Sequence, residues 1–174
     1  PNTGIFTIKD LIAKAKQNPG GLNYATSGNG SAPHLAAALF SQIADIKMTH
    51  IPFRGGSLAI QSVIAGDTQL TFGTPPSVLP MIQAGRLRGL AISLKERSPL
   101  APNLQGMREA GLPDYAIEFW YGVFVPTGTP PEIIQRLYEA TQTAMKQANV
   151  KASLAREGTD VSVSSSPAQF AKFL

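Results

Sequence analysis

Cysteine is absent from the 174 residues, and histidine occurs only twice. The absence of thiols excludes disulfide scaffolds, zinc sites built on cysteine, and cysteine nucleophiles. Two histidines without cysteine also argue against a transition-metal site, and we expect neither a metal nor a cofactor. Paired carboxylates for acid–base chemistry are missing too, because the acidic residues fall in separate predicted loops or element ends.

Long apolar runs are also missing. No stretch approaches the roughly 20 residues that a membrane-spanning helix needs, so the chain is not expected to be embedded in a membrane. No secretory signal is visible. The sequence starts at Pro1 without a preceding Met, and its last helical pattern, from Pro167 to Leu174, stops before any capping residue. We therefore expect a chain that is incomplete at both ends.

Charged residues make up only 15% of the chain, whereas hydrophobic residues make up 43%. This balance indicates a folded globular protein. The formal net charge of +4 is a mild excess, which favours anionic small molecules near the surface. The basic residues are scattered, and their densest run is Arg86–Arg88, so nucleic-acid binding is not expected.

Predicted strands alternate with predicted helices through the first half of the chain. Alternation of this kind is typical of a parallel, doubly wound α/β sheet. A capping box at Thr7 and Asp10 begins the first helix. The expected strands are 22–26, 48–53, 69–72 and 87–93, and the helices between them are 34–44 after Pro33, a helix capped by Ser57 and ending at Gly66, and one opened by 73–77 that ends at Gly85.

The second half has a different character. An aromatic run, Phe119–Val125, predicts a strand whose rings either join the core or stack on a ligand. A long amphipathic helix is expected after Thr129-Pro130-Pro131, since apolar residues recur there at helical spacing. Shorter elements are expected as a helix near Met107–Ala110, a helix over Val150–Arg156 capped by Gly158, a strand at Val161–Val163 and a helix from Pro167.

Three strand-to-helix turns have a similar composition, and they span Thr26–Ser31, Arg54–Ser57 and Gly73–Ser77. Each turn offers small residues, hydroxyls and backbone N–H groups at a predicted helix start. In open α/β sheets, ligands bind beyond the carboxyl ends of the strands, and helix N-termini attract carboxylate or phosphate. The turns together predict an anion site. The alternative is that they are ordinary caps, because Ser, Asn and Gly dominate such loops for conformational reasons.

Other motifs fit poorly. The Gly28-x-Gly30 pair has Pro33 at the third glycine position of a dinucleotide fingerprint, and no acidic residue follows at the expected offset. Phosphate loops of the GKS or GKT type and the Gly-x-Ser-x-Gly elbow of hydrolases are absent. A triad of His34 with Ser27 or Ser31 would need an acid that the spacing does not supply.

Two further side chains, His34 and Arg54, leave two interpretations open. The ring of His34 either reaches the glycine turn or a ligand, or bonds a backbone carbonyl. Arg54 is the one cation at the predicted ligand edge, and it either pairs with a carboxylate or is solvated. For His50, within a predicted strand, a structural role is favoured.

Several segments together resemble the solute receptors of tripartite tricarboxylate transporters, often called Bug-type receptors. The resemblance covers nearly the whole chain in the family's order and spacing. It is carried by Gly21–Ser31 followed by His34-Leu35, by His50–Gly56, by Ala84–Ala91, by Glu109–Pro113, and by Trp120–Pro126 closed by Gly128-Thr129-Pro130.

The resemblance implies a periplasmic-binding-protein fold of type II, the Venus flytrap, with a parallel-rich sheet. It implies one complete lobe, residues 1–92, connecting loops over 93–120, and an incomplete remnant of the first lobe over 121–174. It also implies a periplasmic receptor without catalysis, which holds a mono-, di- or tricarboxylate or an amino acid and delivers it to a membrane permease. An α/β enzyme acting on an acyl or phosphoryl substrate is the alternative.

Family carboxylate contacts map onto Ser27–Ser31 and His34, and extend to Gly73-Thr74. Many relatives carry an acidic or amide residue where Gly73-Thr74 stands, which is a departure from the family pattern. Resemblance and residue patterns together predict the ligand-binding residues Thr26, Ser27, Gly28, Asn29, Gly30, Ser31, His34, Arg54, Gly55, Gly56 and Thr74.

Overall fold

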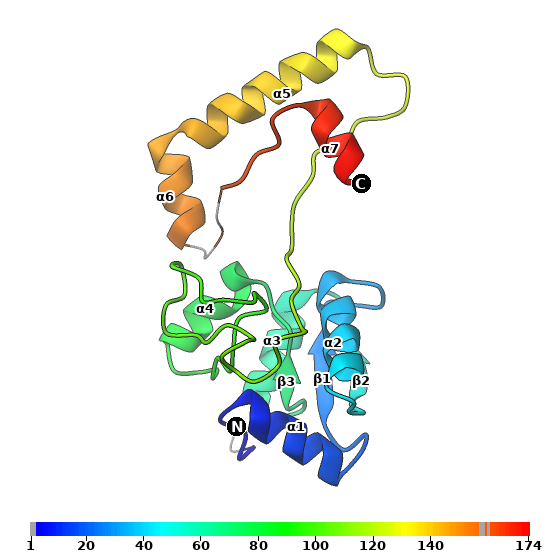
Figure 1. Cartoon of the computed structure of the whole chain (residues 1–174), viewed down its shortest axis with the longest axis vertical. Coiled ribbons are helices and arrows are strands. Elements are labelled where there is room, and N and C mark those ends of the chain that lie inside the picture. The colour runs from blue at the N-terminus through cyan, green and yellow to red at the C-terminus, as the bar shows by residue number, and fades with distance from the viewer. Residues whose placement is uncertain (1–2, 157–158, 160) are drawn as a thin grey trace. The chain divides into compact units, whose positions relative to one another are not determined.

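A computed structural model describes residues 3–156, 159 and 161–174, and it divides the chain into two compact units (Figure 1). The first unit spans 1–119 and the second spans 120–174. Residues 93–119, predicted as connecting loops, therefore pack with the first unit. The assignment of the two units to the two lobes of a receptor stays a prediction.

A three-stranded parallel sheet organises the first unit, with the strand order β2-β1-β3. Its register places Tyr24 opposite His50 on one side and opposite Leu70 on the other. The predicted α/β alternation is confirmed over this region. The elements, in chain order, are α1 (Ile8–Gln17), β1 (Asn23–Thr26), α2 (Ala32–Ile43), β2 (Thr49–Pro52), α3 (Gly56–Ala65), β3 (Leu70–Thr71) and α4 (Pro75–Gln83).

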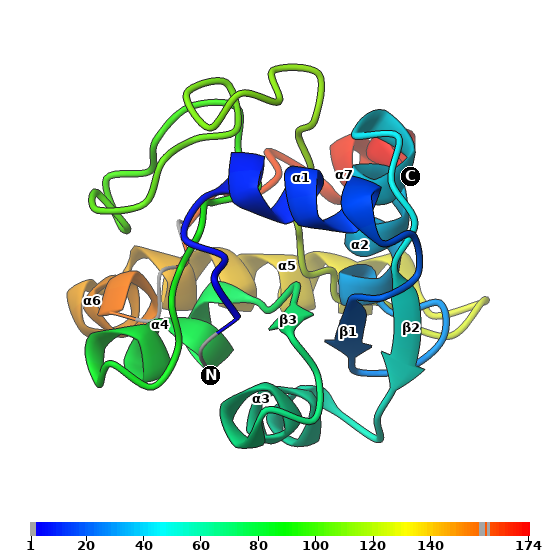
Figure 2. The ribbon, with the colours of Figure 1, turned by 90° about the horizontal axis from the view of Figure 1, so that it is seen from below.

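Helices cover both faces of this sheet, with α1 on one side and α3 on the other (Figure 2). The larger core cluster joins α1 and α2 to the 93–119 segment, and its biggest fully buried side chains are Tyr115 and Phe40, whose rings meet edge to face at 5.5 Å. A smaller cluster packs Ala59 and Val63 of α3 against Ala25. Both faces of β1 are therefore covered, and Tyr24, Ala25 and Thr26 are all buried.

Local signals set most helix ends. The capping box at Thr7 and Asp10 is confirmed, and the hydrogen bond from Thr7 is the main reason that the pKa of the Asp10 carboxyl is lowered. Gly66 ends α3 in the left-handed conformation at φ 93°, as predicted. The expected cap at Ser57 is wrong. Gly55 occupies the N-cap at φ 116°, a conformation open to glycine and strained for other residues, so α3 starts before Ser57.

Three predicted elements of the first unit differ in the structure. Residues 87–93 form no strand. The Ile92 N–H donates to the Gln105 carbonyl and the Ile117 N–H donates to the Ser93 carbonyl, so the end of this segment bonds residues of the 93–119 segment and not the sheet. The third strand is shorter than 69–72. The helix expected near 107–110 is only a hydrogen-bonded turn. Apolar residues in 87–93 still pack on the core, so the pattern indicated burial correctly and strand pairing incorrectly.

The second unit contains α5 (Pro131–Lys146), α6 (Ala148–Arg156) and α7 (Pro167–Phe173), which confirms the three predicted helices. Tyr138 of α5 donates its hydroxyl to the Ser165 carbonyl at 2.6 Å, and Gln142 donates to Ser164 at 2.9 Å. These bonds fasten the segment before α7 to α5. The predicted cap at Gly158 lies outside the described residues.

The aromatic run is not a strand. Trp120 meets Phe170 and Phe173 of α7 edge to face at 5.6 and 5.4 Å, which pairs aromatic rings without backbone pairing. Tyr121 is 79% exposed, so of the two roles predicted for the aromatic rings a place in the core does not apply to Tyr121. Residues 161–163 form no strand either. Within the described part of the chain, no helix has the length and apolar character needed to cross a membrane.

Candidate functional site

The carboxyl ends of β1, β2 and β3 lie at one edge of the sheet, because the strands are parallel. The three predicted turns leave the sheet there and lead into α2, α3 and α4. Topology thus brings the first halves of three helices to the same edge, as the sequence predicted. The Phe53 N–H donates to the Thr26 carbonyl at 3.0 Å, which ties the second turn to the end of β1.

The first turn, Ser27–Ser31, is held by a hydrogen-bond network. Thr26 is fully buried at the end of β1, and its Oγ1 accepts the Gly28 N–H at 3.2 Å. Ser31, the N-cap of α2, donates its hydroxyl to the Gly28 carbonyl at 2.7 Å. The Ser31 N–H donates to the same carbonyl at 3.3 Å. The turn is therefore held by hydrogen bonds within the chain.

Two glycines make this turn possible. Gly28 has φ 131° and Gly30 has φ 72°, both in the region that disfavours residues with a Cβ. A Cβ on Gly28 would also lie 3.7 Å from the Phe53 carbonyl of the second turn. The backbone geometry therefore favours glycine at positions 28 and 30, and Asn29 between them is exposed.

His34 reaches back to the turn, which is the first of its two predicted roles. Its Nδ1 accepts the Gly30 N–H at 3.1 Å, so Nδ1 carries no proton and the neutral ring bears its hydrogen on Nε2. The alternative, a bond from His34 to a backbone carbonyl, is not what this geometry supports. The contact occupies a backbone donor, as do the internal bonds of Gly28 and Ser31.

His50 joins this cluster, although the sequence favoured a structural role for it. Its Nε2 lies 2.6 Å from Thr26 Oγ1. Its ring stacks on His34 with centroids 4.2 Å apart and on Tyr24 at 5.0 Å. Burial lowers the pKa of His50, and the charge that His34 would carry lowers it further. The register that pairs Tyr24 with His50 is the signal that could have placed this ring beside the turn.

The second and third turns lie at the same edge of the sheet as the first turn. Arg54 is exposed, Gly55 caps α3 and Gly56 is its first residue. Thr74 caps α4, and its hydroxyl lies 3.1 Å from the Ser77 hydroxyl, which also bonds the Thr74 carbonyl at 2.7 Å. Topology places these residues at the ligand edge. Among the described residues, no side-chain hydrogen bond links them to the first turn.

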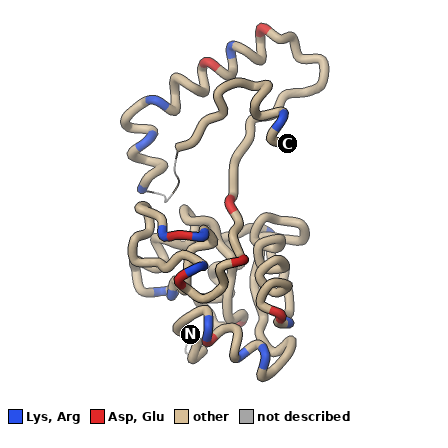
Figure 3. Tube along the Cα trace, viewed as in Figure 1, with Lys and Arg blue, Asp and Glu red and all other residues tan. Residues whose placement is uncertain are grey.

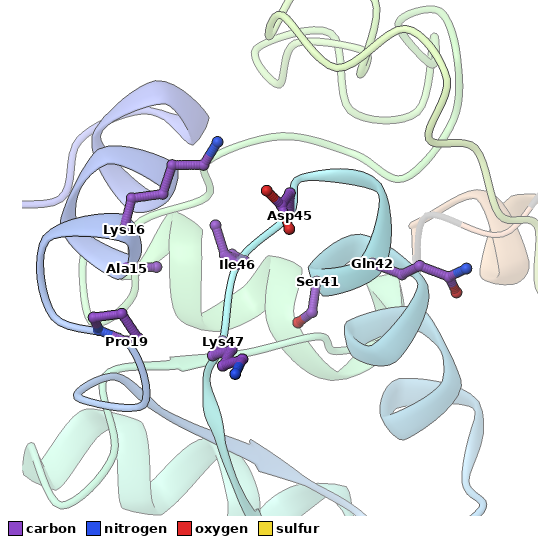
Figure 4. Close-up of a pocket in the computed structure, with 8 residues that line it drawn as sticks. All are labelled: Ala15, Lys16, Pro19, Ser41, Gln42, Asp45, Ile46 and Lys47. Carbon is purple, nitrogen blue, oxygen red and sulfur yellow. The ribbon is translucent and has the colours of Figure 1, made fainter.

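A surface pocket of about 530 Å³ lies elsewhere (Figure 4). It forms where α1 and α2 end, beside the amino ends of β1 and β2, and so at the edge opposite the predicted site. Its lining residues are Ala15, Lys16, Pro19, Ser41, Gln42, Asp45, Ile46 and Lys47. The lining mixes two lysines with an aspartate and lies away from the carboxyl ends of the strands, so the hydrogen-bonded turn remains the better candidate for an anion site.

Charged residues of both signs occur in both units (Figure 3). In α5 and α6, Lys146, Lys151 and Arg156 follow one another with no acidic residue between them. In the first unit, Arg97 pairs with Glu109 and Arg108 pairs with Glu96. The described residues contain no cluster of three or more His, Asp or Glu side chains that could hold a metal ion.

The whole chain, residues 1–174, matches the family described as tripartite tricarboxylate transporter family receptor. The chain therefore belongs to this family of solute receptors, as the resemblance predicted. It is 31% identical over 158 residues to the protein BugT of Bordetella pertussis, an alignment that covers 91% of this chain and 48% of BugT. The chain spans about half the length of curated relatives that it matches.

Solved structures confirm the periplasmic-binding-protein fold class. The structure of R. palustris Rpa4515 with adipate matches with a TM-score of 0.92 and 28% identity, over 99% of this chain and 57% of that one. MatC from Rhodopseudomonas palustris with bound malate matches with a TM-score of 0.87 and 27% identity, over 96% and 57% of the two chains.

Proposed function

We propose that this chain binds a small carboxylate at the carboxyl edge of its sheet, in the periplasm, and passes it to a membrane permease. Family membership supports the receptor role, and two similar proteins have been solved with the dicarboxylates adipate and malate. The observation that carries the proposal is the ordered Ser27–Ser31 turn, set at the start of α2 with His34 folded back onto it.

The chemistry of this edge suits a carboxylate. A helix N-terminus carries about half a positive charge, and backbone N–H and hydroxyl groups donate to anions without a buried countercharge. The exposed guanidinium of Arg54 follows β2 at the same edge, where it attracts an incoming anion and can pair with one of its carboxylates. A dicarboxylate could use the first turn for one end and Arg54 or Thr74 for the other.

An α/β enzyme is the weaker candidate. The Ser31 hydroxyl donates to a backbone carbonyl and His34 Nδ1 accepts a backbone N–H, so these two groups are not arranged as nucleophile and base. A hydrolytic role for this turn would need both contacts to break. We therefore propose capture of the solute without chemical change.

Calorimetric titration of the chain with adipate and malate tests the proposal, with 1,6-hexanediol as a neutral control of adipate's length. We expect binding of a dicarboxylate and none of the diol. Ser31→Ala should weaken binding by about 1–2 kcal/mol through loss of a hydroxyl near an anion. Ser41→Ala is the matched control, because Ser41 bonds the Ala37 carbonyl within α2, away from this edge.

Either of two results would count against this function. Equal affinities of the Ser31 and Ser41 variants would remove the Ser31 side chain from the site. Binding of the diol as tightly as adipate would show that the carboxylates are not recognised.

A further inference from the structure

The hydrogen bond between Gly30 and His34 occupies a backbone N–H that an anion site would need. The Gly30 N–H is at the turn where a carboxylate is expected, yet it donates to His34 Nδ1 at 3.1 Å. Gly30 is exposed, and His34 is half-buried. A ligand can gain this donor only if the imidazole gives it up. Any group that changes the protonation or orientation of the His34 ring therefore decides whether the Gly30 N–H is free to bind a ligand.

Protonation is the direct way to release that donor. A proton added to Nδ1 turns an acceptor into a donor, so the Gly30 N–H and the imidazolium N–H then face each other. Two donors and a positive charge at one point form a place for a carboxylate oxygen, which can accept from both. Uptake of the anion and uptake of the proton would then favour each other.

His50 is placed to set the state of His34. Its ring stacks on His34 at 4.2 Å with only 14° between the planes, and its Nε2 contacts Thr26 Oγ1. The same Thr26 oxygen accepts the Gly28 N–H, so one chain of contacts runs from the turn through Thr26 and His50 to His34. Two stacked imidazoles this close do not both take a proton readily, because the charges repel.

We propose that His50 is a positioning residue of the carboxylate site: it orients His34 against Gly30, and one proton taken up by the stacked pair releases the Gly30 N–H to the ligand. This inference rests on the proposed function. It assigns a specific role to a side chain in the middle of β2. The lowered pKa of His50, caused first by burial and then by His34, agrees with a pair that holds at most one proton.

The titratable and charged groups near His34 and His50 are few among the described residues. Tyr24 of β1 is the other ring stacked on His50, and burial raises the pKa of its phenol, so Tyr24 stays neutral near neutral pH. Arg54 is exposed in the turn after β2. No Asp, Glu, Lys or Arg in the described ranges hydrogen-bonds to either imidazole. Among the described residues, the hydrogen bonds of the two rings go to the Gly30 N–H and Thr26 Oγ1 and not to a carboxylate.

The first arm of the test needs no ligand. The chain has two histidines, so a His50→Gln variant assigns both ring signals in an NMR titration. We expect the Gly30 amide resonance of the unaltered chain to move with the histidine ring signals as pH falls. His50→Gln keeps an amide near the Nε2 position without a titrating ring, and His50→Phe keeps a ring that can stack. A Gly30 amide that ignores histidine titration would overturn the inference.

The second arm measures adipate affinity from about pH 6 to 8.5, where carboxylates stay ionised. Uptake of one proton predicts an affinity that falls by up to about tenfold per pH unit as pH rises. His50→Gln and His50→Phe should alter this slope, whereas Ser41→Ala should not. An identical slope in the unaltered chain and both His50 variants would refute the role of His50. Absence of adipate binding at every pH would instead refute the proposed function, and the ligand-free titration would still decide the inference.

Discussion

Replacing Thr26 by valine tests whether the buried hydroxyl at the end of β1 supports both the fold and the site. Thr26 has no exposed surface, and the nearest partners of its Oγ1 are His50 Nε2 at 2.6 Å and the Gly28 N–H at 3.2 Å, with the Gly28 carbonyl at 3.3 Å. Valine has nearly the same shape but cannot bond His50 or Gly28. A net loss of about 1 kcal/mol per hydrogen bond predicts a destabilisation of about 2 kcal/mol.

Thr68→Val is the matched control. Thr68 is also buried, and its Oγ1 lies 3.0 Å from the Ser62 hydroxyl, just before β3 and so at the opposite edge of the sheet. One lost partner predicts about 1 kcal/mol. Only Thr26→Val should also weaken adipate binding, because only Thr26 touches the turn.

Urea unfolding followed by the histidine ring signals measures the first unit alone, since both histidines lie within it and the single tryptophan does not. The reasoning fails if Thr26→Val costs less than Thr68→Val. It fails equally if both variants bind adipate like the unaltered chain, since the hydroxyl would then be structural only.

Three further predictions use the same protein. Gly30→Ala should destabilise the first unit by about 1–2 kcal/mol, because φ at Gly30 is 72° and an added Cβ would meet no neighbour, so the cost comes from the backbone alone. Gly30→Asn should cost less, because asparagine adopts this left-handed conformation more readily than alanine. Equal urea midpoints for the two variants would contradict this. Tyr115→Phe should cost about 0.5–1.5 kcal/mol through its bond to the Ala36 carbonyl, and Tyr115→Ala about 3–5 kcal/mol through the cavity, both read from urea midpoints. In the folded chain the pKa of His50 lies below its ordinary value of 6.5. Between these two pKa values the unfolded chain binds more protons than the folded chain, so the free energy of unfolding should fall as pH drops through about 6.5. Thermal melts at successive pH values should show this trend, and His50→Gln should flatten it.

Several local signals predicted helix ends correctly, although the cap expected at Ser57 was wrong. The capping box of Thr7 and Asp10, the left-handed Gly66 and the prolines at helix starts each act within a few residues, and the structure confirms them. The strands expected at 22–26, 48–53 and 69–72 are present as β1, β2 and β3, whereas those expected at 87–93, 119–125 and 161–163 are not, because an apolar or aromatic run indicates burial or ring contacts and not backbone pairing. Residues 87–93 are half-buried without joining the sheet, and Trp120 contacts helix rings instead of a neighbouring strand.

The Ser27–Ser31 turn was predictable for the same reason, since glycine and hydroxyl spacing define it locally. The place of His50 was not. In a parallel sheet of short strands, which side chains meet at the edge depends on the register between segments more than twenty residues apart. Here the pairing of Tyr24 with His50 sets that ring beside Thr26, and His34 completes the stack from the first turns of α2. A shift of one residue in β2 would turn His50 to the opposite face of the sheet, leaving the glycine turn intact but without its second imidazole. The proton linkage of the turn is therefore a property of strand register, and it should be lost by changes in β2 that leave every residue of the turn in place.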